Sequence, residues 1–597
     1  ATFSGRRMDF AVMGGAVDQL SLRQGSVVIT GMGIKGRDTT QLVIEGDVEG
    51  PISQALGLLE HPPLGFASKL GIDPAHASGH ARTDLRIGMP LHRDLEPSEV
   101  WVQASATLTD AAVTNLRDRF DLSSGQFELV VDTESLELTG NGAIEGVPLA
   151  IAWRESFDDR AEVKRRFEVE GEVPVAALER FRLEPPLPVD GAFQLQATAV
   201  ESAGVTDIDL VLGLRPLAIR LPGLDWRKAQ GEDGRLVASL TVADQGTVRI
   251  DPFEVTGPAL EATGRVELER EPWRLESLRL ERVRLGDSAG ELSILQDENG
   301  RYQITLDAQT LDLGRLLEIR QQSGGEEATL PPLDASLVAE RVLINGHALT
   351  DASAELRRDE TGWREAHLGA ALPGGGRLEA RLEPENGRQR LTVSSSNAGD
   401  LLQALDQTNR IQGGELSLNA VITRREPTIA AEGTFKIEDF TLLNAPVIAR
   451  LLTLASLTGI GNLLGGEGIF FDRLDLPFEL RDGALIFDRG RMSGSQVGLT
   501  LNGSVELETD QLDLEGTVVP VYTVNRVLGN IPLVGPFLAG KEGEGAFAAT
   551  YWVQGELSDP QITVNPLAVL APGFIRDLFS GLIEGNLEPP EPPQDRN

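Results

Sequence analysis

The stretch Leu378-Glu-Ala-Arg-Leu-Glu-Pro-Glu-Asn-Gly-Arg-Gln-Arg-Leu-Thr-Val393 carries the pattern that decides the fold. Every second residue from Leu378 to Leu382 is apolar, and the alternation resumes at Leu391 after the pair Asn386-Gly387. A period of two places alternate side chains on opposite faces of a strand, and Asn-Gly favours a tight hairpin turn. The stretch therefore predicts a β-hairpin with one apolar face and one polar face.

The same unit recurs from the start of the chain to about residue 430. Leu292 and Ile294 precede a turn at Asn299-Gly300, and residues 416–422 form another one-sided strand. The hairpins share no fixed period of roughly 20 to 50 residues, so the chain is not a strict solenoid. At about 13 residues per strand and turn, the chain would hold roughly 40 strands. The predicted fold is mostly β, an antiparallel and one-sided sheet of great length.

Short helices are expected to interrupt this pattern at 53–71, 108–120 and 311–321. The first is the most apolar, with Ala55, Leu56 and Leu58 ahead of a proline turn. The second is polar apart from a few positions, and the third is short.

The C-terminal third changes character, because apolar segments at 445–457, 518–540 and 572–584 replace the strand alternation. The first and third are amphipathic at helical spacing, whereas prolines break the second. Two interpretations stay open: these helices pack on the sheet and close its end, or they contact a bilayer or a bound lipid. Their apolar side chains are Val447, Ile448, Leu451, Leu452, Leu454, Ile531, Leu533, Phe537, Phe574, Ile575, Leu578, Phe579 and Leu582.

Composition excludes several classes of protein. Cysteine is absent, so disulfides and thiolate metal sites cannot form. Acids outnumber bases by 91 to 54 and give a net charge of -37, which opposes nucleic-acid binding. The acids are scattered along the chain, as expected for a solvated outer face.

The sequence contains no well-supported motif for catalysis, a cofactor or a metal. The glycines of Gly31-Met-Gly33-Ile-Lys-Gly36 match a dinucleotide fingerprint, but residues 39–45 alternate like a strand and offer no helix N-terminus for a pyrophosphate. We therefore expect a protein that is not an enzyme and that has no cofactor and no metal. Four residues with metal-ligand chemistry lie among glycines and prolines that predict loops, namely Asp73, His76, His80 and His92.

Three regions are expected: repeating strands at 1–430, strands with amphipathic helices at 431–587, and a disordered, acidic and proline-rich tail at 588–597. The chain opens with Ala1 and shows neither a signal peptide nor a spanning helix at its start. Because Phe10 to Val12 already alternates like a strand, we expect that the natural N-terminus lies upstream.

Motifs in the C-terminal third carry a resemblance to a known family. The chain resembles the YhdP group of the AsmA-like C-terminal family, most specifically between residues 468 and 573. The motifs there are Gly468-Ile-Phe-Phe-Asp472, Leu476-Pro-Phe-Glu-Leu-Arg-Asp-Gly483, Met492-Ser-Gly494, Asn530-Ile-Pro-Leu-Val-Gly-Pro536, Asp559-Pro560, Asn565-Pro566 and Ala571-Pro-Gly573. Looser matches are Pro63-Leu-Gly-Phe66, Gly71-Ile-Asp-Pro74 and Leu224-Asp-Trp226-Arg-Lys228.

The resemblance implies a twisted, repeating β-groove, an open gutter with an apolar concave face, shared with TamB and chorein-type bridges. It implies transport of phospholipids between the inner and outer membranes, with both membranes and other envelope proteins as partners. It also implies a periplasmic location and an N-terminal membrane anchor, which this chain lacks.

Under this hypothesis the one-sided strands form the groove. The alternative is a structural β-scaffold or adhesin-like protein of the cell envelope, which would require a filled interior. The expected groove residues are Leu378, Leu382, Leu416, Leu418, Ile422, Leu499, Leu501, Val505, Leu507, Leu512 and Leu514.

Overall fold

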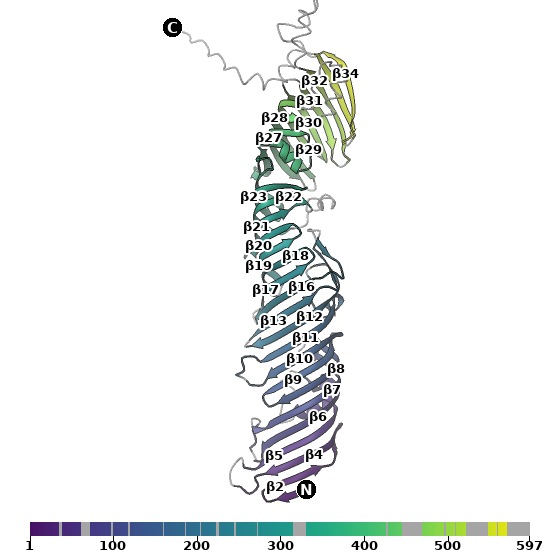
Figure 1. The fold of residues 1–597 in the computed structure, drawn as a ribbon, viewed down its shortest axis with the longest axis vertical. Helices are drawn as coiled ribbons and strands as arrows, with labels where there is room; N and C mark the ends of the chain where they lie inside the picture. Colours follow the sequence, from purple (N-terminus) through teal and green to yellow (C-terminus); the bar gives the residue numbers. More distant parts are fainter. Residues whose placement is uncertain are drawn as a thin grey trace, which may run out of the picture. The chain divides into compact units, whose positions relative to one another are not determined.

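Strands dominate the computed structural model of the chain, as the sequence predicts (Figure 1). Its described residues form 34 strands, with helices α1 (Ile52–Glu60) and α4 (Ala398–Ala404) beside them. The mostly β fold is thereby confirmed. The structure describes residues 1–34, 39–60, 72–92, 94–96, 99–116, 120–158, 160–185, 187–202, 204–221, 226–243, 246–270, 273–314, 330–425, 428–443, 468–494, 497–507, 509–520, 547–557 and 559–569.

The chain forms two compact units, which are described separately. Unit 1 consists of Ala1–Gly286 and Glu291–Leu295, and unit 2 of Asp287–Gly290 and Gln296–Asn597. The boundary falls within β20 (Ser288–Gln296). The region boundary predicted near residue 430 rests on composition and stays a prediction.

Unit 1 is an open antiparallel sheet in which most strands pair with the next strand along the chain. Exceptions are β2, which pairs with β4 while β3 also pairs with β4, and a side branch, in which β14 and β15 pair beside β12 while β13 pairs with β16. Its strands are β1 (Thr2–Ser4), β2 (Arg7–Val12), β3 (Gly15–Val17), β4 (Leu20–Thr30), β5 (Gln41–Pro51), β6 (Ala77–Pro90), β7 (Trp101–Leu116), β8 (Phe120–Asp132), β9 (Ser135–Ile144), β10 (Val147–Ser156), β11 (Arg165–Pro174), β12 (Val189–Ser202), β13 (Val205–Gly213), β14 (Leu217–Leu221), β15 (Trp226–Lys228), β16 (Arg235–Ala243), β17 (Thr247–Gly257), β18 (Leu260–Arg270) and β19 (Trp273–Leu285).

Unit 2 continues with the same type of ladder but departs from it once. Strands β21 and β22 pair in parallel, because the connection 313–332 returns the chain to the end at which β21 began. The expectation of a wholly antiparallel sheet is therefore wrong at this pair. The strands are β21 (Tyr302–Asp312), β22 (Leu333–Ile344), β23 (His347–Asp359), β24 (Gly362–Ala371), β25 (Arg377–Glu385), β26 (Arg388–Ser395), β27 (Ile411–Arg425), β28 (Thr428–Leu442), β29 (Ile469–Arg481), β30 (Ala484–Ser493), β31 (Val497–Glu506), β32 (Gln511–Pro520), β33 (Phe547–Glu556) and β34 (Gln561–Val569).

The register gives each sheet one apolar face. Directly opposite residues share a face, so a row can be followed from strand to strand. In unit 1 one such row is Ala106, Leu129, Leu138, Trp153, Phe167, Ala199, Ile208, Leu240, Ile250, Val266 and Leu278. The adjacent row on the other face is mainly polar: Thr107, Glu128, Thr139, Ala152, Glu168, Thr198, Asp209 and Ser239.

Long and short connections lie at opposite ends of the strands. In unit 1 the segments 52–76, 175–188 and 214–234 emerge at one end, which we call the loop rim. They hold α1, the 3-10 turns η1 (Pro74–His76) and η3 (Val175–Ala177), and the β14–β15 branch. The other end, the turn rim, has shorter connections, such as 91–100 and 133–134.

Unit 2 has the same asymmetry. The connections 396–410, 443–468 and 521–546 all begin and end at its loop rim, and α4 lies in the first of them. Its turn rim has connections such as 360–361, 386–387 and 482–483.

The predicted hairpin at 378–393 is confirmed, since β25 and β26 pair across a turn at Asn386-Gly387. The helix expected near 53–71 begins at Ile52, and residues 61–71 lie outside the described part.

The helix predicted at 108–120 is wrong, because the described residues of this stretch belong to β7 and β8. Three register shifts between β7 and β8, with positive φ at Asp110 and Asn115, interrupt the strand alternation there. Of the helix expected at 311–321, Leu311 and Asp312 instead end β21, and residues 315–321 lie outside the described part.

Candidate functional site

The expected groove residues gather on the apolar face of unit 2. Those on strands come from β25 (Leu378, Leu382), β27 (Leu416, Leu418, Ile422), β31 (Leu499, Leu501, Val505) and β32 (Leu512, Leu514). A single row connects these strands: Leu382, Leu391, Ala420, Gly433, Phe478, Phe487, Gly503, Leu514, Val553 and Ile562. Leu507 follows the end of β31 and is 53% exposed.

The same face includes aromatic residues that the sequence reasoning did not single out. Phe435 lies opposite Leu418, and Phe478 lies opposite Phe487. The signal was present, since Leu476, Phe478 and Leu480 alternate with polar neighbours. In the sequence, these three residues had indicated only the family motif at 476–483.

Towards the loop rim the apolar face is deeply buried. Ile437 is 0% exposed, and the rings of Phe440 and Phe471 stack with centroids 5.5 Å apart. Helix α4 adds Leu401 to the same cluster, and its N-terminus is capped by Asn397, whose side chain accepts a bond from the Asp400 amide. This end of the face is therefore a closed hydrophobic core.

The middle of the apolar face is only half-buried. Leu418, Phe435 and Leu501 each keep part of their surface accessible, although their neighbours towards the loop rim, such as Leu416 and Leu499, are 5% exposed. The apolar face thus has a filled core at the loop rim, and farther along the strands half-buried side chains such as Leu418 lie among buried ones such as Ala420 and Leu512.

On the polar face of unit 1, ion pairs join neighbouring strands. Arg154 Nη2 lies 2.9 Å from Glu137 Oε1, and Arg249 Nε lies 2.9 Å from Glu267 Oε1. Both pairs are exposed, so each stabilises the fold by about 1 kcal/mol or less. Their main effect is to keep this face hydrated.

Charged groups also lie on the apolar face of unit 1, at its turn rim. Arg165 Nε lies 2.9 Å from Glu155 Oε1, and its Nη1 donates to Glu201 Oε1 at 3.0 Å. Burial lowers the pKa of Arg165, but hydrogen bonds and charges from both carboxylates outweigh burial and leave the pKa above its usual value. This triad ends the apolar row beyond Trp153 and Phe167.

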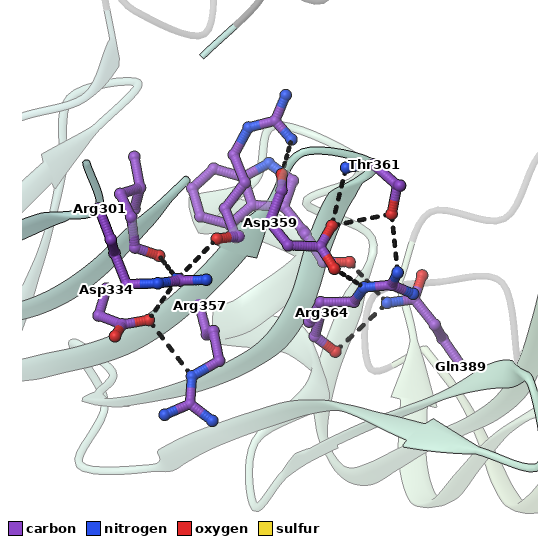
Figure 2. A network of polar contacts seen from close by, with 10 residues as sticks. Arg301, Asp334, Arg357, Asp359, Thr361, Arg364 and Gln389 are labelled. Atoms are coloured by element: carbon purple, nitrogen blue, oxygen red, sulfur yellow. Dashed lines mark hydrogen bonds and ion pairs between the residues drawn. The ribbon is translucent and has the colours of Figure 1, made fainter. Parts of the chain in front are cut away.

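In unit 2 a polar network surrounds the turn rim (Figure 2). Asp334 accepts from Arg301 Nη1 at 3.0 Å and from Arg357 Nε at 3.2 Å. Asp359 accepts from Arg364 and from the Thr361 hydroxyl. The bond from Arg364 is the main reason that the pKa of Asp359 falls to about 2.

We expect Asp359→Asn to destabilise unit 2 at neutral pH but not in strong acid. The pKa of Asp359 is lowered in the fold from 3.8 to about 2, so its stabilising effect is complete above the unfolded value and disappears as pH falls through the folded one. Because the side chain is 32% exposed, the effect should be small. Hydrogen exchange of β23 and β24 amides from about pH 6 to pH 2 measures it. A constant difference between variant and parent across this range would contradict the expectation.

The four residues with metal-ligand chemistry, Asp73, His76, His80 and His92, do not come together at one site. His76 contacts Asp73 at 3.5 Å, while His80 and His92 contact Glu49 and Glu99. Within the ranges that the structure describes, no three His, Cys, Asp or Glu side chains gather as a metal site would require. Gly31 and Gly33 have positive φ and lie in a turn after β4.

The apolar side chains at 447–454, 531–537 and 574–582, predicted to cap the groove or contact a membrane, lie outside the described residues. Among the helices that are described, none has the length and hydropathy to cross a bilayer.

Comparison with known proteins identifies the family. A family model described as YhdP protein matches residues 1–374 and 330–562. Searches among curated proteins and among solved structures found no match. The YhdP family is a family of envelope proteins with a role in lipid transport. Because the two matched ranges together cover most of the sequence, the chain belongs to the YhdP family.

Proposed function

We propose that this chain is a conduit for phospholipids between the inner and outer membranes, and that the acyl chains slide along its apolar face. One observation supports the proposal: in each unit, rows of mainly apolar residues run from strand to strand on one face, while the other face is mainly polar. A soluble sheet with a short core needs no such rows.

The physical need for such a face follows from the hydrophobic effect. At about 0.8 kcal/mol per CH₂, exposing two chains of about 16 carbons to water costs on the order of 25 kcal/mol, as an upper bound. A continuous apolar bed removes most of this barrier, because the tails never leave contact with side chains such as Leu418 and Leu501. The charged headgroup stays in water.

The two rims would then play different parts. The buried core at the loop rim holds the sheet together, and the short connections at the turn rim leave space for headgroups. The segments 445–457, 518–540 and 572–584 would cap the groove or contact the outer membrane. The conduit would lie in the periplasm, with an upstream helix as its inner-membrane anchor.

The half-buried middle rows favour a conduit over a structural scaffold. A scaffold or adhesin is expected to fill its interior with its own side chains, as the loop rim does around Ile437. Accessible apolar surface along many consecutive strands is costly in water unless a ligand covers it.

Photocrosslinking tests the proposal directly. A photoreactive residue at Leu418 or Leu501 is expected to crosslink phospholipid in cells, because both side chains lie half-buried on the apolar face. The same residue at Asn419, on the polar face of β27, is the matched control and should not crosslink. Protein purified without phospholipid, and equal labelling at Leu418 and Asn419, would refute the conduit.

A further inference from the structure

Two buried polar side chains interrupt the apolar face of unit 2 at its turn rim. Arg358 lies opposite Leu333 and is 5% exposed. Gln389 lies opposite Ile422 and is 7% exposed. Both register positions belong to the apolar face. Hydrophobic packing alone does not explain an arginine and a glutamine there.

The guanidinium of Arg358 has no counterion. Its Nη1 donates to the backbone oxygen of Asp359 at 3.3 Å, and its Nε is buried without an acceptor. The nearby carboxylates are occupied, since Asp359 binds Arg364 and Asp334 binds Arg301 (Figure 2). In the part of the chain that the structure describes, Arg358 forms no ion pair with any carboxylate. Burying an unpaired cation is unfavourable unless an anion joins it.

Gln389 offers an acceptor beside this donor. Its Nε2 donates to the backbone oxygens of Trp363 and Arg364 at 2.7 and 3.3 Å. Because both oxygens can only accept, the amide nitrogen must face them, and Oε1 points away. That Oε1 is buried and has no donor within the described residues. Arg358 lies opposite Trp363, so a free donor and a free acceptor flank this tryptophan.

We propose that Arg358 and Gln389 bind the phosphodiester headgroup of a phospholipid whose acyl chains lie on the apolar face. The phosphate would accept from the Arg358 guanidinium, and a hydroxyl or ammonium of the headgroup would donate to Gln389 Oε1. This assignment rests on the proposed function. The position fits, because the apolar rows end at the turn rim and a headgroup must leave the apolar bed there. In a chain of net charge -37, an unpaired cation also provides a specific place for an anion.

The test uses two ligands that differ only in the headgroup: dihexanoyl phosphatidylethanolamine and dihexanoylglycerol, both below their micelle concentrations. The full chain should bind the phospholipid more tightly. Arg358→Met should reduce this preference about 10-fold or more, because a charge-assisted bond to phosphate is lost. Should R358M fail to fold by circular dichroism, R358Q, which keeps donors but no charge, takes its place and should show the same loss.

Arg357→Met is the matched control. Arg357 is the neighbouring arginine, but it lies on the polar face, pairs with Asp334 and is 56% exposed. R357M should keep the preference for phospholipid.

Each other outcome has a defined meaning. A preference that R358M leaves unchanged, or equal binding of both ligands by the parent chain, overturns the headgroup assignment while leaving an apolar groove. Displacement of the phospholipid by inorganic phosphate at similar concentration would assign Arg358 to a free anion and also overturn it. If neither lipid binds, the proposed function fails and this inference fails with it.

Discussion

Leu418→Asp is expected to abolish lipid occupancy of the chain and to block transport. Leu418 lies on the apolar face of β27 between Val393 and Phe435, so a carboxylate there would face the acyl chains. The Asp side chain is too short for its carboxylate to reach water beyond the apolar face, unlike the charged ends of Arg or Lys. Placing a charged side chain in an apolar environment costs about 3 kcal/mol, or about 100-fold in the local affinity for a tail.

The effect on transport should exceed the local effect. A conduit works in series, so one position that repels tails blocks every lipid that must pass it. A protein that binds lipid at separate independent sites would instead lose only a fraction of its occupancy.

Asn419→Asp is the matched control, since it places the same charge one residue away on the polar face. Asn419 lies opposite Thr392 and Thr434 and is exposed, so this variant should transport lipid normally. The measurements are phospholipid co-purified with each variant and growth or lipid flux in cells that depend on it. Folding is checked by circular dichroism. Transport that survives L418D in a folded protein would argue against the sliding mechanism.

The one-sided sheet could be predicted from the sequence because its cause is local. Alternation such as Leu378, Ala380 and Leu382 fixes which side chains share a face, and the Asn386-Gly387 turn fixes the register of the next strand. Both signals lie within one hairpin. The placement of the expected groove residues on one face follows from the same two rules.

Features that depend on distant contacts could not be predicted. The parallel pairing of β21 and β22 depends on a long connection whose path is not a local property. The strands around 108–120 are held by pairing despite bulges that disturb their period. Arg358 and Gln389 look like ordinary polar residues in the sequence. Only the register reveals that they face inward and lack partners.

Gly516→Ala is expected to disrupt the end of the apolar face in unit 2. Gly516 lies opposite Tyr551, which is 4% exposed and donates its hydroxyl hydrogen to the Thr500 backbone oxygen at 2.6 Å. A Cβ at position 516 would lie 2.5 Å from the Tyr551 hydroxyl and closer still to the Thr500 oxygen. Neither group can yield easily, because one is buried and the other is backbone.

Two costs combine in this variant. Overpacking a filled site costs about 1 to 3 kcal/mol, and a buried hydroxyl that loses its acceptor costs about 1 to 3 kcal/mol more. Burial already raises the pKa of Tyr551, so the ring cannot compensate by ionising near neutral pH. Hydrogen exchange of the amides in β31, β32 and β33 should show a loss of protection of about 2 to 6 kcal/mol.

Gly57→Ala separates this steric effect from the general effect of replacing glycine. Gly57 lies within α1, and a Cβ there would meet nothing within 4 Å. Alanine in a helix interior should stabilise by up to about 1 kcal/mol, so this variant should gain protection in α1. If Gly516→Ala left the hydrogen exchange of the surrounding amides unchanged, Tyr551 would have room to move. The end of the apolar face would then be a loose edge, and the hydroxyl bond to Thr500 would not be needed to hold it closed.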